Sequence, residues 1–194
     1  MEKKLKKVEL MELNEAYNKV LYWFFSFPNM EIGLNDLSEN LSISKTTAKK
    51  VINRMVEENF LIKKVYGKAW GITCNKDHYY NYTRKVAFNL TLVYDFYEDV
   101  RFHIFSKVGN SKAVVLFGSY RKGDDIETSD IDLAIEVADN KELKIIESGF
   151  IPLFGYREKV KVNLHIFSRN KINVNLFSNI ANGIVLEGFL EVRP

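Results

Sequence analysis

Two aspartates separated by one residue, Asp130 and Asp132, are the side chains of this sequence most suited to chemistry. They stand at the start of the apolar segment 131–135, which is typical of a strand. Because the side chains of a strand alternate between its faces, the aspartates share one face, while Ile131 and Leu133 point to the other. Two carboxylates this close repel each other unless a divalent cation lies between them. The pair therefore predicts a metal site for Mg²⁺, or for Mn²⁺ in its place.

A glycine and a serine end the preceding apolar segment. Residues 113–117 read as a buried strand that leads into Gly118 and Ser119, and a polar loop, 120–129, follows. Gly118 lets a phosphate approach the backbone closely, and the Ser119 hydroxyl with nearby N–H groups can bind phosphate oxygens. A phosphate site beside a metal site suits phosphoryl transfer, in which metal ions bridge the phosphates and neutralise developing charge. The expected substrate is a nucleoside triphosphate, and the expected reaction is adenylyl or other nucleotidyl transfer.

The loop itself carries charges of both signs. Arg121 and Lys122 follow Ser119 closely, so they are candidates for clamping the triphosphate, and solvated loop cations are the alternative. For the acidic residues Asp124, Asp125 and Glu127, no role beyond solubility is expected.

These residues resemble the signature of the DNA polymerase beta nucleotidyltransferase superfamily, in which a hydrophobic-Gly-Ser step is followed by a loop and an Asp-x-Asp strand. The matching segments are Phe117–Ser119 and Asp130–Leu133, and the resemblance covers about residues 108–192. In size this region is similar to the minimal nucleotidyltransferases of prokaryotes. The resemblance implies transfer of nucleotides to RNA ends, proteins or small molecules. It also makes a partner protein of toxin-antitoxin type a possibility.

The fold of that family implies a third acidic residue on a later strand, which helps to bind metal and to activate the acceptor. The strand is expected at 160–167, and the matching residue is Asn163, whose amide oxygen can bind a metal but cannot act as a general base. His165 lies on the same strand face and is a hypothetical substitute base. Glu158, reaching in from the preceding loop, is the other candidate, and a histidine without catalytic duty is the third interpretation.

The first part of the chain reads as three helices followed by a hairpin. Apolar residues at helical intervals predict the helices, Pro28 ends the first, and Ser44 is a good N-cap for the third. The helices are expected at 14–26, 34–41 and 45–58, and the hairpin strands at 60–65 and 69–73. This order resembles a winged helix-turn-helix over about residues 10–75.

The third of these helices has a polar face opposite its apolar stripe. Thr46, Lys50, Asn53 and Arg54 share that face. It suits a DNA major groove, with Lys50 and Arg54 for phosphate or guanine and Asn53 for adenine edges. Segment 45–68 has seven basic residues against two acidic ones, so an acidic partner would dock there. A solvated helix face or a protein interaction module is the alternative.

Residues 79–107 contain no Pro or Gly and predict one long helix. Its apolar residues recur at intervals of three and four, which suits another helix, so the segment could connect two domains or pair across a homodimer. Those residues are Val86, Leu90, Val93, Tyr97, Val100 and Ile104. A helix at 174–182 and a last strand at 184–192 are expected to complete the chain.

Composition excludes several classes of protein. The chain has 194 residues, of which 46% are hydrophobic and 27% charged, as is ordinary for a globular protein. A single cysteine, Cys74, excludes an internal disulfide and a cysteine metal cluster. The apolar run 20–25 is far too short for a membrane span, and Lys and Glu interrupt any signal peptide within 1–10, so a cytoplasmic protein is expected.

The expectation is an α+β protein in three parts: a winged helix-turn-helix at 1–76, a connecting helix at 77–107, and a small mixed-sheet nucleotidyltransferase fold at 108–194. The expected function is Mg²⁺-dependent transfer of a nucleoside monophosphate to a hydroxyl of RNA, protein or a small molecule. The winged helix would bind nucleic acid. The alternative is a DNA-binding transcriptional regulator whose degenerate nucleotidyltransferase domain senses nucleotides, and Asn163 favours it.

Overall fold

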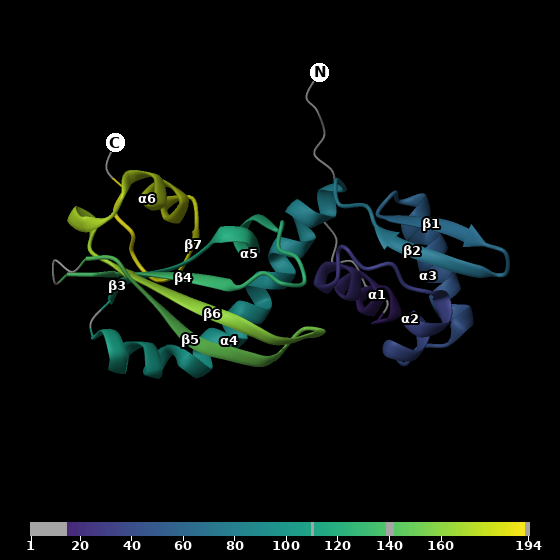
Figure 1. The fold of residues 1–194 in the computed structure, drawn as a ribbon, viewed down its shortest axis with the longest axis horizontal. Helices are drawn as coiled ribbons and strands as arrows, with labels where there is room; N and C mark the ends of the chain where they lie inside the picture. Colours follow the sequence, from purple (N-terminus) through teal and green to yellow (C-terminus); the bar gives the residue numbers. More distant parts are fainter. Residues whose placement is uncertain (1–14, 110, 139–141, 193–194) are drawn as a thin grey trace, which may run out of the picture.

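A computed structural model describes residues 15–109, 111–138 and 142–192. Helices and sheets are mixed along the chain, so the fold is α+β as expected (Figure 1). One hydrophobic core is built from residues between 16 and 80, and the five-stranded sheet has further apolar clusters on its two faces. Within the described residues, no helix combines the length and the apolar character that crossing a membrane requires.

The N-terminal module, residues 15–76, has the order of elements that the sequence predicts. Ser44 caps the third helix by accepting a hydrogen bond from the Thr47 N–H at 3.1 Å. A single bridge between Ile32 and Ile72 ties the segment after the first helix to the hairpin. The elements are α1 (Glu15–Ser26), α2 (Leu34–Asn40), α3 (Lys45–Glu57), β1 (Leu61–Tyr66) and β2 (Ala69–Cys74), and β1 and β2 pair antiparallel.

The long helix begins later than the sequence predicts and has a different partner. A 3₁₀ turn, η1 (Tyr79–Tyr82), precedes α4 (Arg84–Val108). Phe88, near the start of α4, stacks on Tyr22 of α1 with ring centroids 4.4 Å apart. The apolar stripe beyond it, including Val93, Tyr97 and Ile104, packs against the sheet. The prediction that another helix covers this stripe was therefore wrong. The stripe also gives no support for a homodimer, since the sheet already covers these three side chains. The side chain of Val100 lies outside the described residues.

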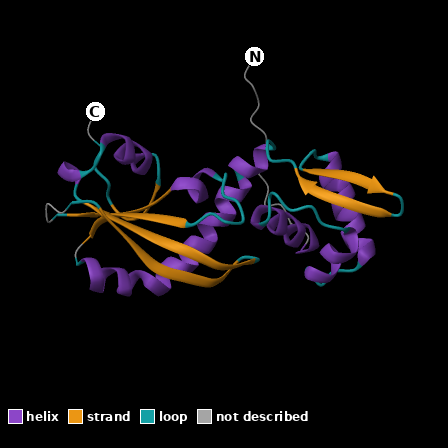
Figure 2. Ribbon diagram, viewed as in Figure 1, coloured by secondary structure: helices purple, strands orange, loops and turns teal. Residues whose placement is uncertain are grey.

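The sheet has the order β5-β6-β4-β3-β7, in which β4 and β6 pair parallel and the other neighbours antiparallel (Figure 2). The mixed sheet was expected, but β5 was not, because Gly149 and Pro152 interrupt its sequence and most of its side chains are exposed. The last strand ends at Gly188, four residues earlier than expected. The strands are β3 (Ser111–Phe117), β4 (Ile131–Val137), β5 (Lys144–Phe154), β6 (Arg157–Phe167) and β7 (Ile184–Gly188).

The sheet lies between two helical layers (Figure 1). The α4 stripe covers one face, while Ile180 and its neighbours in α6 (Val174–Ala181) pack on the other face against residues such as Val115 and Phe167. A short helix, α5 (Gly118–Lys122), begins where β3 ends, in what the sequence predicted as loop. A 3₁₀ turn, η2 (Arg169–Lys171), follows β6. The end of β3, the start of α5 and the start of β4 meet at one end of the sheet, and this place is called the junction below.

Candidate active site

Asp132 lies at the centre of this junction. In the sheet register it is opposite Phe117 of β3 on one side and Asn163 of β6 on the other. The Asn163 Nδ2 atom lies 3.4 Å from Oδ2 of Asp130 and 3.4 Å from Oδ1 of Asp132. The two aspartates therefore converge on one point, although Asp130 lies just before β4 rather than within it. An amide donor between two carboxylates reduces their mutual repulsion.

The glycine of the motif allows β3 to end against the aspartates. Gly118 has φ +74°, a conformation that strains residues with a Cβ atom. A Cβ at this position would lie 2.9 Å from Oδ2 of Asp132. Any other residue would therefore push the strand end away from the carboxylate, so the motif needs glycine for geometry on two counts.

His165 contacts the same aspartate and is largely buried. Its Nε2 atom lies 3.0 Å from Oδ1 of Asp132, its side chain is 12% exposed, and its ring meets Phe117 edge to face at 4.9 Å. Since a carboxylate without a proton only accepts, a hydrogen bond here requires the tautomer that carries the proton on Nε2. The Nδ1 atom is buried and has no hydrogen-bond partner among the described residues. The lone pair that a base would need is thus directed into the protein.

Glu158 does not reach the aspartates. It lies within β6 rather than in a loop, is exposed, and pairs with Leu153 near the turn of the β5–β6 hairpin. Five residues separate it from Asn163, which corresponds to about 16 Å along a strand. Its prediction as a substitute base was wrong, because the sequence showed no β5 and so misplaced the start of β6.

All of the residues expected to bind phosphate except Ser119 line a small pocket at the end of β3. Its volume is about 160 Å³, and its walls come from the end of β3, from α5 and from α6. Arg121 and Lys122 lie here, and the Arg121 Nε atom is buried without a hydrogen-bond partner among the described residues. Asn179 of α6 and Asn182, which directly follows that helix, also line the pocket, and the sequence did not single them out. Ser119 follows Gly118 in the first turn of α5.

The side chains at the junction fit a hard divalent cation. Asp130 and Asp132 offer carboxylate oxygens, and Asn163 has an amide oxygen that rotation of its side chain would bring to the same point. Among the described residues, no three His, Cys, Asp or Glu side chains form a metal-binding group. Two carboxylates are nonetheless the protein share of many Mg²⁺ sites, in which substrate phosphates and water complete the coordination.

A comparison with known protein families finds a match for this part of the chain. Residues 103–181 match the family model of the nucleotidyltransferase domain. No curated protein matches the chain. The matched region contains both halves of the motif, Phe117–Ser119 and Asp130–Leu133, together with the strand that carries Asn163. The junction described above therefore lies within the region that matches the nucleotidyltransferase domain.

The loop between the two halves of the motif contributes one member of a buried ion pair that the sequence analysis missed. Asp125 is 3% exposed, and its Oδ2 atom lies 3.3 Å from Nζ of Lys85, which is 1% exposed. Asn89 donates to Oδ1 of Asp125 at 2.7 Å. Burial raises the pKa of Asp125 and lowers the pKa of Lys85, while the attraction between the two charges opposes both shifts. The expectation that Asp125 serves only solubility was wrong.

Arg157 fixes the backbone directly before the aspartates. Its buried guanidinium donates to the carbonyl oxygens of Glu127 and Ser129, each at 2.8 Å, and to the hydroxyl of Tyr120. Asp130 follows Ser129, so this contact sets where the first carboxylate begins. Lys85 and Asn89 stand four residues apart on α4, but nothing in the sequence shows that they are buried, so it carried no clear signal for this polar network.

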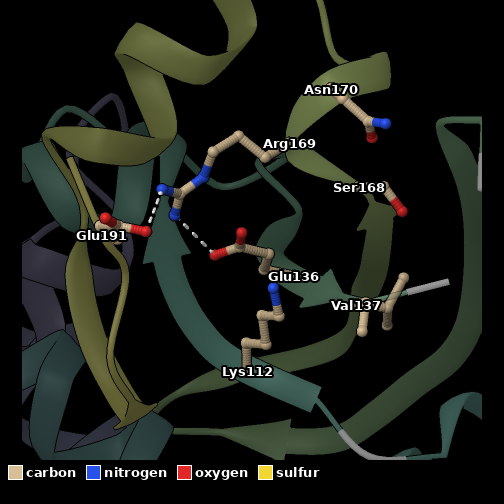
Figure 3. A pocket seen from close by; sticks show the side chains of 8 residues that line it. Lys112, Glu136, Val137, Ser168, Arg169, Asn170 and Glu191 are labelled. Carbon is tan, nitrogen blue, oxygen red and sulfur yellow. Dashed lines mark hydrogen bonds and ion pairs between the residues drawn. The ribbon is translucent and has the colours of Figure 1, made fainter. Parts of the chain in front are cut away.

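A second hollow lies at the opposite end of the same strands (Figure 3). It has a volume of about 390 Å³, and its lining includes Lys112, Glu136, Arg169 and Glu191. Arg169 donates to the carboxylates of buried Glu136 and of Glu191, each at 3.1 Å. Four residues of β4 separate Glu136 from Asp132, about 13 Å along the strand. This ion-pair cluster holds the C-terminal segment against the sheet and is separate from the candidate active site.

The polar face of α3 divides into two parts. Thr46 and Lys50 are exposed, and Asn53 accepts a hydrogen bond from Lys63 of the hairpin at 2.9 Å. Arg54 instead turns toward α1, since it pairs with Glu58 at 2.9 Å and its guanidinium lies 4.9 Å from the ring centroid of Tyr17. Of the four side chains predicted to share a surface, two are therefore engaged in contacts within the N-terminal module, and these contacts differ.

Proposed function

We propose that this protein is a Mg²⁺-dependent nucleotidyltransferase that moves a nucleoside monophosphate from a nucleoside triphosphate to a hydroxyl of RNA, protein or a small molecule. The observation that carries this proposal is the convergence of Asp130 and Asp132 beside Gly118 within a matched nucleotidyltransferase domain. Mn²⁺ is expected to substitute for Mg²⁺, since both prefer oxygen ligands.

The side chains of the junction have distinct roles in this proposal. Asp130 and Asp132 hold the metal, which neutralises charge on the triphosphate as the transition state forms. Gly118 admits the triphosphate to the backbone, and Ser119, Arg121 and Lys122 bind its oxygens in and beside the 160 Å³ pocket. The acceptor hydroxyl oxygen bonds to the α-phosphorus and its proton passes to solvent, while the bond between the α-phosphorus and the bridging oxygen breaks and pyrophosphate leaves.

A transfer assay tests this function. Purified protein is incubated with Mg²⁺ or Mn²⁺, each α-labelled nucleoside triphosphate, and a pool of host RNA and protein. A variant carrying Asp130→Ala and Asp132→Ala is the control. Label transferred by the wild type alone supports the proposal and identifies the nucleotide and the acceptor class. Label transferred equally by both proteins contradicts it.

His165 is expected to act through Asp132 rather than as the base. His165→Ala should lower transfer by about tenfold or more, because residues that orient a metal ligand typically contribute that much. His165→Gln keeps a donor on the same strand face and should recover part of the loss. Initial rates of the three proteins at saturating Mg²⁺ make the comparison. If the two variants lose activity equally, a proton-transfer role for the imidazole is favoured. Unchanged turnover of His165→Ala excludes both proton transfer and positioning of Asp132.

We further propose that the N-terminal module is a winged helix that binds nucleic acid. Lys50→Ala should weaken DNA binding and reduce the slope of log affinity against log salt by about one, because one phosphate contact is lost. Arg54→Ala should leave the slope unchanged, since Arg54 is held by Glu58 and Tyr17. Binding measured by fluorescence anisotropy over a series of salt concentrations tests both statements. Affinity that does not depend on salt contradicts a phosphate contact.

A regulator that senses nucleotides is the second candidate function. The observation in its favour is Asn163, which stands where the family's fold implies an acidic residue and which donates toward both aspartates. In that case calorimetry should detect metal-dependent binding of a nucleoside triphosphate, while no labelled product forms with any acceptor. Turnover with any acceptor pool excludes this alternative.

A further inference from the structure

The segment that joins the two halves of the motif contacts the N-terminal module. Residues 126–129, here called the 126–129 turn, come directly before Asp130. The Ser129 N–H donates to the Ile126 carbonyl at 3.0 Å, and the Ile126 N–H donates to the Ser129 hydroxyl at 2.9 Å. This reciprocal pair closes the turn, so a shift of the turn would displace the first carboxylate of the motif.

Two residues hold the 126–129 turn. Arg157 of β6 contacts it from the five-stranded sheet, and Asn29 contacts it from the N-terminal module. Asn29 follows α1 in the N-terminal module. Its backbone N–H donates to Oε1 of Glu127, and its Nδ2 donates to Oε2, each at 2.8 Å. The remaining oxygen of the Asn29 amide accepts from Nζ of Lys76, just after β2, at 2.9 Å. The lysine thus fixes which way the amide points, because only its nitrogen can face Glu127.

Two further features support a built contact. Glu127 is half-buried, and although burial alone would raise its pKa, N–H groups including that of Asn29 keep the pKa lowered, so the side chain is an ionised acceptor. At the other end of the segment, a Cβ on Gly123 would lie 1.9 Å from the carbonyl oxygen of Asn81, just before α4. The segment between the motif halves therefore lies against residues outside the nucleotidyltransferase domain at both of its ends.

We infer that Asn29 and Glu127 are positioning residues, through which the N-terminal module holds the 126–129 turn and thereby the aspartates of the candidate active site. The inference rests on the proposed function for its effect on nucleotide binding. It makes the affinity of the site for a triphosphate depend on a residue of the N-terminal module. Neither residue belongs to the aspartate pair or to the lining of the pocket beside Gly118.

An exchange of donor and acceptor tests the contact. Asn29→Asp replaces the donating amide nitrogen with an oxygen that faces the Glu127 carboxylate, and Glu127→Gln places an amide nitrogen against the Asn29 amide nitrogen. Each single variant therefore loses the hydrogen bond between the two side chains and keeps only the one from the backbone N–H of residue 29. The double variant restores it, because the introduced glutamine amide can donate to the new carboxylate while its oxygen still accepts from the backbone N–H. Asp124→Asn is the matched control, since it removes an exposed carboxylate from the same loop.

Two measurements on the full chain separate positioning from simple stability. Hydrogen exchange of residues 123–132 without ligand should be faster in both single variants and should return to the wild-type rate in the double variant. Calorimetric affinity for each of the four nucleoside triphosphates with Mg²⁺ should fall about two- to tenfold in the single variants, as expected for one or two hydrogen bonds, and recover in the double variant. Global unfolding in urea should change little.

The outcomes distinguish this inference from the proposed function. Exchange or affinity that is unchanged in the single variants overturns the inference, and so does a double variant that is no better than the singles. If the wild type binds no triphosphate, the proposed function fails, and the exchange rates alone then decide whether Asn29 positions the turn. An effect of Asp124→Asn as large as that of Glu127→Gln also overturns the inference, because any charge in the loop would then matter equally.

Discussion

Replacing Lys85 with Met is expected to lower the free energy of unfolding by about 3 kcal/mol, because it removes the nearer cation from a buried carboxylate and leaves only Arg157, whose Nη1 atom lies 3.9 Å away. Asp125 lies with Lys85 almost completely out of solvent, and Asn89 donates only to one of its oxygens. Methionine fills a similar volume, so the loss reports on charge rather than on a cavity. Urea denaturation measures the change in unfolding free energy.

Two comparisons isolate the cause. Lys161 pairs with Glu147 at 3.9 Å on the exposed face of the hairpin, and Lys161→Met should cost no more than about 1 kcal/mol. Asp125→Leu together with Lys85→Met should cost less than Lys85→Met alone, because the buried carboxylate is removed with its nearer cation, while Arg157 keeps its hydrogen bonds to the carbonyl oxygens of Glu127 and Ser129. A Lys85→Met protein as stable as the wild type contradicts the buried ion pair.

The cost of Lys85→Met should also depend on pH in one direction. Burial already raises the pKa of Asp125, and loss of the neighbouring cation raises it further. A raised folded-state pKa means that the folded protein binds the proton more tightly than the unfolded chain, so stability falls as pH rises through that pKa. The deficit relative to the wild type should therefore shrink as the pH is lowered and Asp125 takes up a proton.

Replacing Asp132 with Asn is expected to lower nucleotidyl transfer by at least about 10³-fold, which corresponds to ~4 kcal/mol of transition-state stabilisation. Asp132 lies at the centre of the junction, where Asn163, His165 and Gly118 all meet it. An amide has nearly the shape of the carboxylate but lacks the charge that holds a cation. Initial rates with the labelled nucleotide identified in the transfer assay measure the effect.

Stability separates this prediction from misfolding. The oxygen of the introduced amide can still accept from His165, and removing one of two neighbouring negative charges relieves repulsion, so the unfolding free energy should stay unchanged or rise slightly. Asp95→Asn, on the exposed face of α4, is a control that should leave both rate and stability unchanged. Transfer by the Asp132→Asn protein at the wild-type rate contradicts the assignment of the metal site.

Local signals predicted much of this fold. Helix capping by Ser44, the turn between β1 and β2, and the alternation at the start of β4 depend on neighbouring residues, so the sequence was enough to indicate those elements. The strand β5 was missed, because an edge strand exposes many of its side chains and need not alternate cleanly. The partner of α4 was also missed, since an apolar stripe indicates that a face is buried but not whether a helix or a sheet covers it.

The residues of the candidate site also divide into those that the sequence predicted and those that it did not. Gly118, Asp130 and Asp132 lie in one short segment, and their convergence follows from strand alternation and one tight turn. The roles of Asp125 and Glu127 could not be predicted, because their partners Lys85 and Asn29 come from distant parts of the chain. From its sequence alone, a charged loop is expected to be exposed to solvent. Only its tertiary contacts show which of its carboxylates have partners elsewhere in the chain.

The central claim is that bond cleavage occurs between the α- and β-phosphates. Parallel reactions with one nucleoside triphosphate, labelled either at the α- or at the γ-phosphate, test this most directly. We predict that the α-label becomes attached to the acceptor, that the γ-label is released as pyrophosphate, and that both processes require Mg²⁺ or Mn²⁺ and Asp132. Attachment of the γ-label to the acceptor, or its release as inorganic phosphate without any transfer of the α-label, would contradict nucleotidyl transfer.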